Sequence, residues 1–199
     1  MTTADAEHGI VSSDEEELIL VDADDRETGS LSKAECHDGA GILHRAFSVF
    51  VFNSRGELLL QQRAGGKRLW PLYWSNSCCS HPRKGEEMAV ATERRLQQEL
   101  GLSATLEFVY KFSYQARYGD IGAEHELCWV YLGRTDGPVV PNANEIAAVR
   151  FVGQGELATE LAQHGDRFTP WFRLEWQRCR QDFAGQLARL RGARPRVIA

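Results

Sequence analysis

The pattern of hydrophobic and polar positions predicts a series of short β-strands. Segment 18–33, LILVDADDRETGSLSK, predicts one short strand followed by a turn rich in Asp, Gly and Ser. Two β-rich runs over 46–64 flank the turn sequence NSRG at 53–56, which predicts a hairpin. Segments 106–118 and 125–135 predict two further strands.

Helical spacing is clearest between Glu86 and Leu100. Ala89, Leu96 and Leu100 recur at that spacing, and Gly101 follows as a C-terminal stop. Two more helices are predicted, one over 155–165 and one from 171 to about 190.

This order of elements predicts an α+β fold, a mixed β-sheet with helices packed on it. A chain of 199 residues suits one well-buried domain. We expect this single domain to span 17–185. The acidic segment 1–16 is expected to be disordered, and the basic segment 186–199 to form a loose tail.

Charge and hydropathy exclude several classes of function. The formal net charge of −5 gives no general attraction to nucleic acid or to an anionic membrane. No apolar run approaches the ~18 residues that a membrane span needs. The first 17 residues contain neither a basic region nor an apolar core, so they do not resemble a secretion signal. These features predict neither a nucleic acid nor a membrane as partner, and they leave the oligomeric state open.

Segment 73–87, YWSNSCCSHPRKGEE, concentrates sulfur, imidazole and carboxylate groups. A disulfide, a metal site and a catalytic acid all remain open from this stretch alone. Adjacent Cys78 and Cys79 are poorly placed to bond each other, and an odd count of five cysteines fits a reducing, cytoplasmic compartment. In that setting clustered thiols more often bind metal or do chemistry. The five cysteines are Cys36, Cys78, Cys79, Cys128 and Cys179.

A second group of candidate residues combines imidazoles and carboxylates. Glu124 and Glu126 lie two apart on a predicted strand, so both point to one face. Nitrogen and oxygen ligands of this kind suit Mn²⁺, Mg²⁺ or Zn²⁺. A lone histidine is more often structural or exposed, and this interpretation is retained for His8, His125 and His164.

Segment 80–102, SHPRKGEEMAVATERRLQQELGL, resembles a Nudix box. Glu86, Arg94, Glu99 and Gly101 match that pattern. The resemblance implies a Nudix-type fold, with a mixed β-sheet core flanked by helices. Without the resemblance, the segment is an amphipathic helix whose Arg95–Glu99 surface pair is worth a few tenths of a kcal/mol.

The same segment departs from the Nudix box at three positions. Ser80 replaces the first glycine, and Arg95 and Gln98 each replace a glutamate. A Nudix hydrolase gathers several carboxylates to hold Mg²⁺ and activate water. Because only Glu99 remains in place, the departures count against hydrolysis.

Six segments in order resemble the type I, metal-dependent, Nudix-fold isopentenyl-diphosphate isomerases. The resemblance runs from about Leu18 to Trp176. It implies interconversion of isopentenyl and dimethylallyl diphosphate by protonation and deprotonation, in isoprenoid biosynthesis. The segments are ECHDGAGILHRAF, QQRAGGKRLWP, NSCCSHP, FSYQARY, AEHELCW and FTPWFR.

The resemblance assigns roles to individual residues. Cys79 and Glu126 are the two proton carriers, on opposite sides of a flat substrate. Tyr114 resembles the tyrosine that hydrogen-bonds the glutamate, and Trp171 resembles the tryptophan whose face stabilises the carbocation. The implied ligands of a tightly bound Mn²⁺, Mg²⁺ or Zn²⁺ ion are His37, His44, His81, Glu124 and Glu126.

The resemblance also implies a site for the diphosphate. A second metal ion, Mg²⁺ shared with the substrate, is expected on Glu99 and the backbone carbonyl of Cys79. The expected cationic contacts are Lys33, Arg63, Lys67 and Arg95. Solvated surface charges are expected at Arg68, Arg83 and Lys84, and packing roles at Cys78, Cys128 and Cys179.

Two other functions remain open. One is a Nudix diphosphate hydrolase, which phosphate release would reveal. The other is a non-catalytic, zinc-stabilised binding module, although no Cys-x-x-Cys pair of structural-zinc spacing occurs. Chelation would unfold such a module but would only stop the turnover of an enzyme. Its candidate ligands are Cys36, His37, Cys78, Cys79 and His81.

Overall fold

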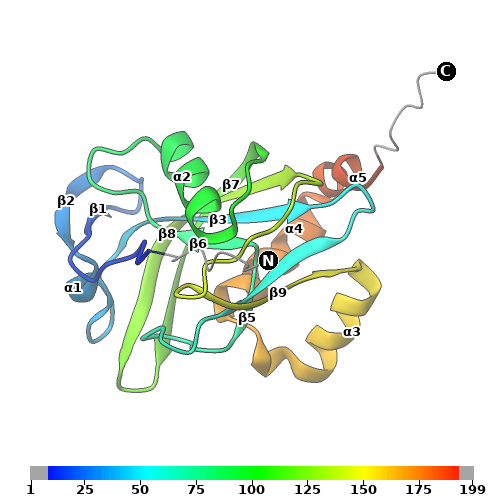
Figure 1. Cartoon of the computed structure of the whole chain (residues 1–199). Coiled ribbons are helices and arrows are strands. Elements are labelled where there is room, and N and C mark those ends of the chain that lie inside the picture. Colours follow the sequence, from blue (N-terminus) through cyan, green and yellow to red (C-terminus); the bar gives the residue numbers. More distant parts are fainter. Residues whose placement is uncertain (1–8, 193–199) are drawn as a thin grey trace, which may run out of the picture.

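The computed structural model describes residues 9–192, with side chains to residue 190 (Figure 1). A mixed β-sheet runs through the molecule and helices pack on it, which confirms the predicted fold class. None of the described helices is both long enough and apolar enough to cross a membrane. His8 lies outside the described residues.

The first hairpin pairs β1 (Glu17–Val21) with β2 (Glu27–Ser32). The sequence predicted only the first of these strands. The second carries polar residues and lies half exposed at the end of the sheet path, so its composition resembled a turn. Helix α1 (Lys33–His37) follows directly, with a capping box between Ser32 and Glu35 at its start.

Strand β3 (His44–Phe52) lies at the centre of the sheet. It runs parallel to β8 (Gly122–Arg134) and antiparallel to the short β6 (Cys78–Ser80). Strand β8 pairs along its other edge with β7 (Thr105–Tyr118). Both strands predicted for this part of the chain are confirmed.

The predicted hairpin at 53–56 is confirmed, but its strands soon separate. Only Phe52 and Leu58 pair across it, and β4 (Leu58–Arg63) then pairs with β9 (Ile146–Val152) and β5 (Trp74–Ser75). Every side chain of β3 from Ala46 to Phe52 is buried, because both faces of the strand are covered.

Side chains of β3 alternate between two hydrophobic clusters. Phe47 and Val49 pack with helix α2 (Met88–Leu100), and Phe50 and Phe52 pack with helix α4 (Pro170–Asp182). The two helices therefore cover opposite faces of the strand (Figure 1). Helix α2 ends at Gly101 with φ of 62°, the predicted stop.

The helix predicted from 171 to about 190 is broken in two. Helix α4 ends at Phe183, whose ring stacks on Tyr110 at 4.8 Å, and α5 (Ala184–Gly192) begins at the next residue. Helix α3 (Gln154–His164) confirms the other predicted helix, and the 3-10 turn η1 (Gly165–Arg167) joins it to α4.

Ordered contacts occur close to both expected domain boundaries, residues 17 and 185. Residues 9–16 hydrogen-bond to α1 and to Asn142, and Leu187 of α5 is buried. Residues 1–8 and 193–199 lie outside the described part. The division of the chain into a disordered lead-in, a domain over 17–185 and a loose tail stays a prediction.

Candidate active site

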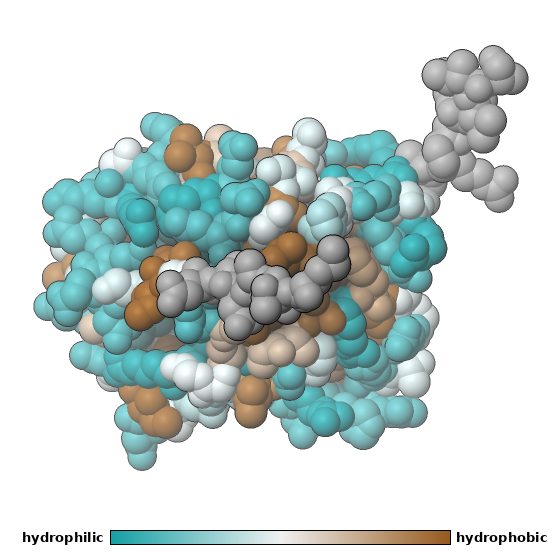
Figure 2. All heavy atoms as spheres, in the orientation of Figure 1, coloured by the Kyte–Doolittle hydropathy of each residue, from teal (hydrophilic) through white to brown (hydrophobic). Residues whose placement is uncertain are grey.

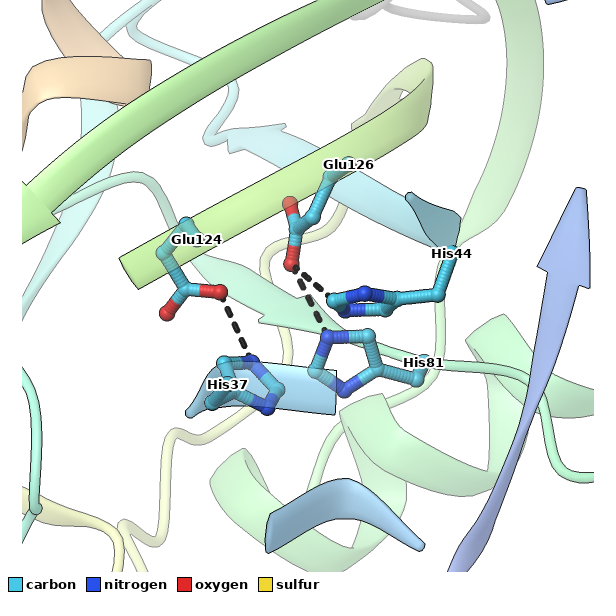
Figure 3. Close-up of side chains that lie close together, drawn as sticks. All are labelled: His37, His44, His81, Glu124 and Glu126. Atoms are coloured by element: carbon cyan, nitrogen blue, oxygen red, sulfur yellow. Dashed lines mark hydrogen bonds and ion pairs between the residues drawn. The ribbon is translucent and has the colours of Figure 1, made fainter. Parts of the chain in front are cut away.

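Five ligand-type side chains meet at one end of the sheet (Figure 3). One ligand atom from each lies within 4.8 Å of all the others. Glu124 and Glu126 lie on β8 with the spacing of two that puts both on one face, as predicted. His37 ends α1, His44 begins β3 and His81 follows β6. The structure thus brings together the whole predicted His/Glu ligand set.

Backbone carbonyls orient two of the imidazoles. Nδ1–H of His37 donates to the Lys33 carbonyl, and Nδ1–H of His44 donates to the Ile42 carbonyl, both at 2.7 Å. A carbonyl can only accept, so in the neutral form of each ring Nε2 carries the lone pair and points into the cluster. Nε2 of His44 is buried and has no hydrogen-bond partner. This donor set and its unpartnered nitrogen fit a divalent metal ion.

The two carboxylates have different neighbours. Glu124 lies 2.8 Å from Nε2 of His37, whereas Glu126 contacts Nε2 of His81 at 2.9 Å and accepts from the Tyr114 hydroxyl at 2.6 Å. Burial raises the pKa of Glu126, and the charge of Glu124 adds to that effect. For Glu124, burial is outweighed by the charge of His37, and its pKa is lowered.

A cavity of about 370 Å³ opens beside this cluster. Its lining includes all four residues expected to do chemistry: Cys79, Tyr114, Glu126 and Trp171. Cys78 is fully buried on the α2 side of the sheet, whereas Cys79 lies on the α4 side, where the cavity opens. The predicted alternation of the two thiols is confirmed. Burial raises the pKa of the Cys79 thiol to about 12.

Aromatic side chains form one wall of the cavity. Trp171, near the start of α4, meets Trp70 edge to face at 5.3 Å and lies 6.3 Å from the Tyr114 ring. The Arg63 guanidinium lies over the Trp171 ring at 5.3 Å. Nη1 of Arg63 is 4.0 Å from Sγ of Cys79. A cation can therefore lie against this indole.

The four predicted cationic residues line the same cavity. Each already contacts an oxygen of the protein. Lys67 pairs with Glu145, and Lys33 donates to the Ser12 hydroxyl. The remaining two donate to backbone carbonyls, Arg63 to Leu69 and Trp70, and Arg95 to Val11 at 2.5 Å.

Arg95 and Glu99 form a buried ion pair. Nε and Nη2 of Arg95 donate to Oε1 of Glu99 at 2.9 and 2.6 Å, and both side chains are about 3% exposed. The interpretation as a surface pair is therefore wrong, because α2 turns this face inward. Glu99 lies behind Arg95 and outside the cavity lining. The Mg²⁺ site on Glu99 and the Cys79 carbonyl stays a prediction.

Of the three residues expected to be solvated surface charges, two lie outside the cavity lining and one lies at the cavity mouth. Arg83 pairs with Glu16 and Lys84 with Glu17 at the surface, as expected. Arg68 instead lines the mouth of the cavity and donates to Asp38 and to the Ile121 carbonyl.

Three residues of this region were not predicted from the sequence. Ser12 and Glu145 contact predicted cations, and neither carried a recognisable signal. Glu175 is buried on α4. Its signal was available, because it is a carboxylate at helical spacing between apolar Trp171 and Cys179.

The candidate ligands of a zinc-stabilised module are not gathered together. Cys36 is buried against the Leu31 carbonyl, and Cys78 packs under α2. Within residues 9–192 the ligand cluster contains His37 and His81 but no cysteine.

Comparison with known proteins agrees with this geometry. The NUDIX domain profile matches residues 42–172. "Isopentenyl-diphosphate Delta-isomerase 1" of Photorhabdus laumondii is 44% identical over 163 residues, 81% of this chain and 93% of its own. "Isopentenyl-diphosphate Delta-isomerase" of Serratia proteamaculans is 46% identical over 159 residues, 79% and 88% of the two chains.

The chain belongs to the isopentenyl-diphosphate Delta-isomerase family. A third member, from Burkholderia multivorans, is 46% identical over 158 residues, 79% of this chain and 89% of its own. Solved structures with this fold are more distant. A Deinococcus radiodurans protein, DR0079, has a TM-score of 0.62 at 21% identity and covers 75% of this chain and 90% of its own. That likeness shows the fold of this isomerase family member and no more.

Proposed function

We propose that this protein interconverts isopentenyl and dimethylallyl diphosphate. One observation carries the proposal beyond family membership. One cavity is lined by a thiol, a carboxylate, an aromatic wall and a group of cations, which are the parts this reaction needs.

The reaction moves a proton over three carbons. One carrier protonates the terminal carbon of the double bond, which leaves a tertiary carbocation at the branched carbon. The other carrier removes a proton from the neighbouring CH₂, and the new double bond forms there. Cys79 and Glu126 are the proposed carriers, and they exchange roles when the reaction runs in reverse.

The carbocation must be protected from water, and it needs an electron-rich group beside it. Trp171 is 3% exposed and presents its ring at the cavity wall, so the π-face can stabilise the cation by up to ~2 kcal/mol. The Tyr114 hydroxyl holds one oxygen of Glu126 at 2.6 Å, which fixes the rotamer of the proton carrier.

The His/Glu cluster would hold a divalent ion through His37, His44, His81, Glu124 and Glu126. When bound, such an ion supplies positive charge that lowers the pKa of the Glu126 carboxyl. Mn²⁺, Mg²⁺ and Zn²⁺ are the proposed candidates. The backbone carbonyls of Lys33 and Ile42 orient the imidazoles of His37 and His44 for this role.

The diphosphate is proposed to bind Lys33, Arg63, Lys67 and Arg95, which requires it to replace part of their present contacts. Planar guanidinium groups suit phosphate oxygens. We keep Glu99 and the Cys79 carbonyl as the proposed Mg²⁺ ligands. A role in isoprenoid biosynthesis and a cytoplasmic location remain proposals, the second resting on five free cysteines.

The test is incubation of the purified protein with isopentenyl diphosphate, Mg²⁺ and Mn²⁺. We expect dimethylallyl diphosphate to accumulate while inorganic phosphate stays at the level of the blank. Phosphate release without the isomer would instead identify a hydrolase.

A further inference from the structure

Glu175 is a buried carboxyl that the chemistry above does not use. It is 1% exposed and lies on α4 among the aromatic residues Phe172 and Trp176. The other buried glutamates in residues 9–190 contact an arginine, a lysine or a histidine, and Glu175 has no such ion pair. A buried carboxyl without a cation requires an explanation.

Its contacts join three elements of the active site. Oε1 of Glu175 accepts from Sγ of Cys128 on β8 at 3.4 Å, and the same sulfur is 3.5 Å from Oγ of Ser48 on β3. Cys128 is two residues beyond Glu126, on the same face of the strand. The Glu175 side chain therefore ties α4 to the strand that carries one proposed proton carrier.

Ser48 extends the connection to the second carrier. It is directly opposite Cys79 in the antiparallel pair of β3 and β6, and directly opposite side chains share one face of a sheet. Trp171 lies four residues before Glu175, so the two are neighbours on one face of α4. Glu175 thus lies one helical turn from Trp171 and contacts β8, the strand that carries Glu126.

Glu175 is held in its neutral form at neutral pH. Burial raises its pKa to about 8, although hydrogen bonds from Ser48 and Cys128 act in the opposite direction. Its Oε2 atom is buried without a partner, an arrangement that costs less for a neutral carboxyl than for a carboxylate. The titratable groups facing it are Cys128 and Glu126 of β8, Tyr110 of β7, Cys79 of β6 and Cys179 of α4.

We propose that Glu175 is a positioning residue for the isomerisation, which fixes Trp171 on α4 against the strands of Cys79 and Glu126. This inference rests on the proposed function. Ionised Glu175 places a negative charge on a carboxyl whose Oε2 atom is buried without a partner, so ionisation works against this packing of α4 on β8. Turnover is therefore supported below about pH 8 and falls as Glu175 ionises above it.

The test compares Glu175→Gln with Glu175→Leu across pH 6 to 10. Gln is an uncharged isostere that keeps the hydrogen bonds, whereas Leu keeps the volume without them. We expect Gln to retain turnover within about 3-fold at pH 7 and to lose the alkaline fall near pH 8. Leu should lower kcat about 10- to 100-fold with little change in KM, because small misplacements of reacting groups have effects of that size.

Trp176→Phe is the matched control for helix packing. It alters the adjacent buried residue on α4 and should leave the pH profile of the parent unchanged. An alkaline fall that persists in Glu175→Gln, or equal kcat losses in Gln and Leu, would overturn the positioning role while the parent remains an isomerase. An inactive parent would overturn the proposed function itself.

Discussion

At the scale of single residues, the adjacent cysteines Cys78 and Cys79 lie in different surroundings. Both side chains carry a thiol, but Cys78 packs under α2, whereas Cys79 lines the cavity. This placement follows from strand alternation, which is why it was predictable from the sequence. The burial of Arg95 was not predictable from the sequence, because it depends on which face of α2 meets the sheet.

We expect Cys79→Ala to remove nearly all isomerase turnover and Cys78→Ala to leave it close to that of the parent. Loss of an acid–base partner reduces a rate by ~10² to 10⁴. Steady-state assays of both variants, with thermal unfolding as a check on folding, measure the difference. Equal losses would show that the pair of cysteines acts through packing.

Glu126 and Glu124 provide a second comparison of neighbouring residues. Glu126→Gln keeps the size and one ligand oxygen but cannot carry a proton, so it should retain much of its metal and lose turnover as fully as Cys79→Ala. Glu124→Gln should lose activity in step with metal content and recover partly in excess metal. Rescue of Glu126→Gln by added metal to near the parent rate would reduce its role to coordination.

At the scale of elements, long patterned segments were predictable and contacts between distant segments were not. Helix α2 and strands β7 and β8 followed directly from periodicity. Strand β2 was missed because an exposed end strand has a polar sequence. The break before α5 was also missed, since it depends on Phe183 stacking against Tyr110 from another element.

The approach of α1 to β8 depends on one glycine. A Cβ on Gly122 would lie 2.4 Å from the backbone oxygen of His37. We expect Gly122→Ala to displace His37 and weaken metal retention ~10-fold or more, the scale on which disturbed ligand support acts. Metal content after dialysis against graded chelator measures this.

Gly155→Ala is the control for that substitution. A Cβ at Gly155 meets nothing within 4 Å, and alanine favours a helix such as α3 by ~0.5 to 1 kcal/mol. This variant should retain its metal fully and unfold at the same or a higher temperature. Similar metal loss in both variants would contradict the steric role of Gly122.

At the scale of the whole molecule, the cavity lies where several distant segments converge. Its lining comes from the N-terminal segment, α1, the end of β4 and the loop after it, β6, α2, β7, β8, the segment before β9, and α4. Hydrophilic residues cover much of the visible surface (Figure 2), and the formal net charge is −5. Lys33, Arg63, Lys67 and Arg95 nevertheless gather at the cavity of this acidic protein, which suits a small anionic substrate.

The grouping of the five His/Glu side chains, and the placement of Cys79 and Glu126 at one cavity, were predicted from the sequence through the resemblance of their segments to one family. The supporting contacts of Ser12, Glu145 and Glu175 were not, because each depends on the packing of segments far apart in the chain. Ser12 and Glu145 reach the cavity lining, and Glu175 reaches β8, only through this packing.

The central claim is that the cavity moves a proton between Cys79, Glu126 and the substrate. Incubation with isopentenyl diphosphate and Mg²⁺ in D₂O, followed by NMR, tests it most directly. We expect dimethylallyl diphosphate with deuterium in the methyl group formed from the terminal alkene carbon, and no such product from Cys79→Ala. Absence of the product, or a product free of deuterium, would contradict it.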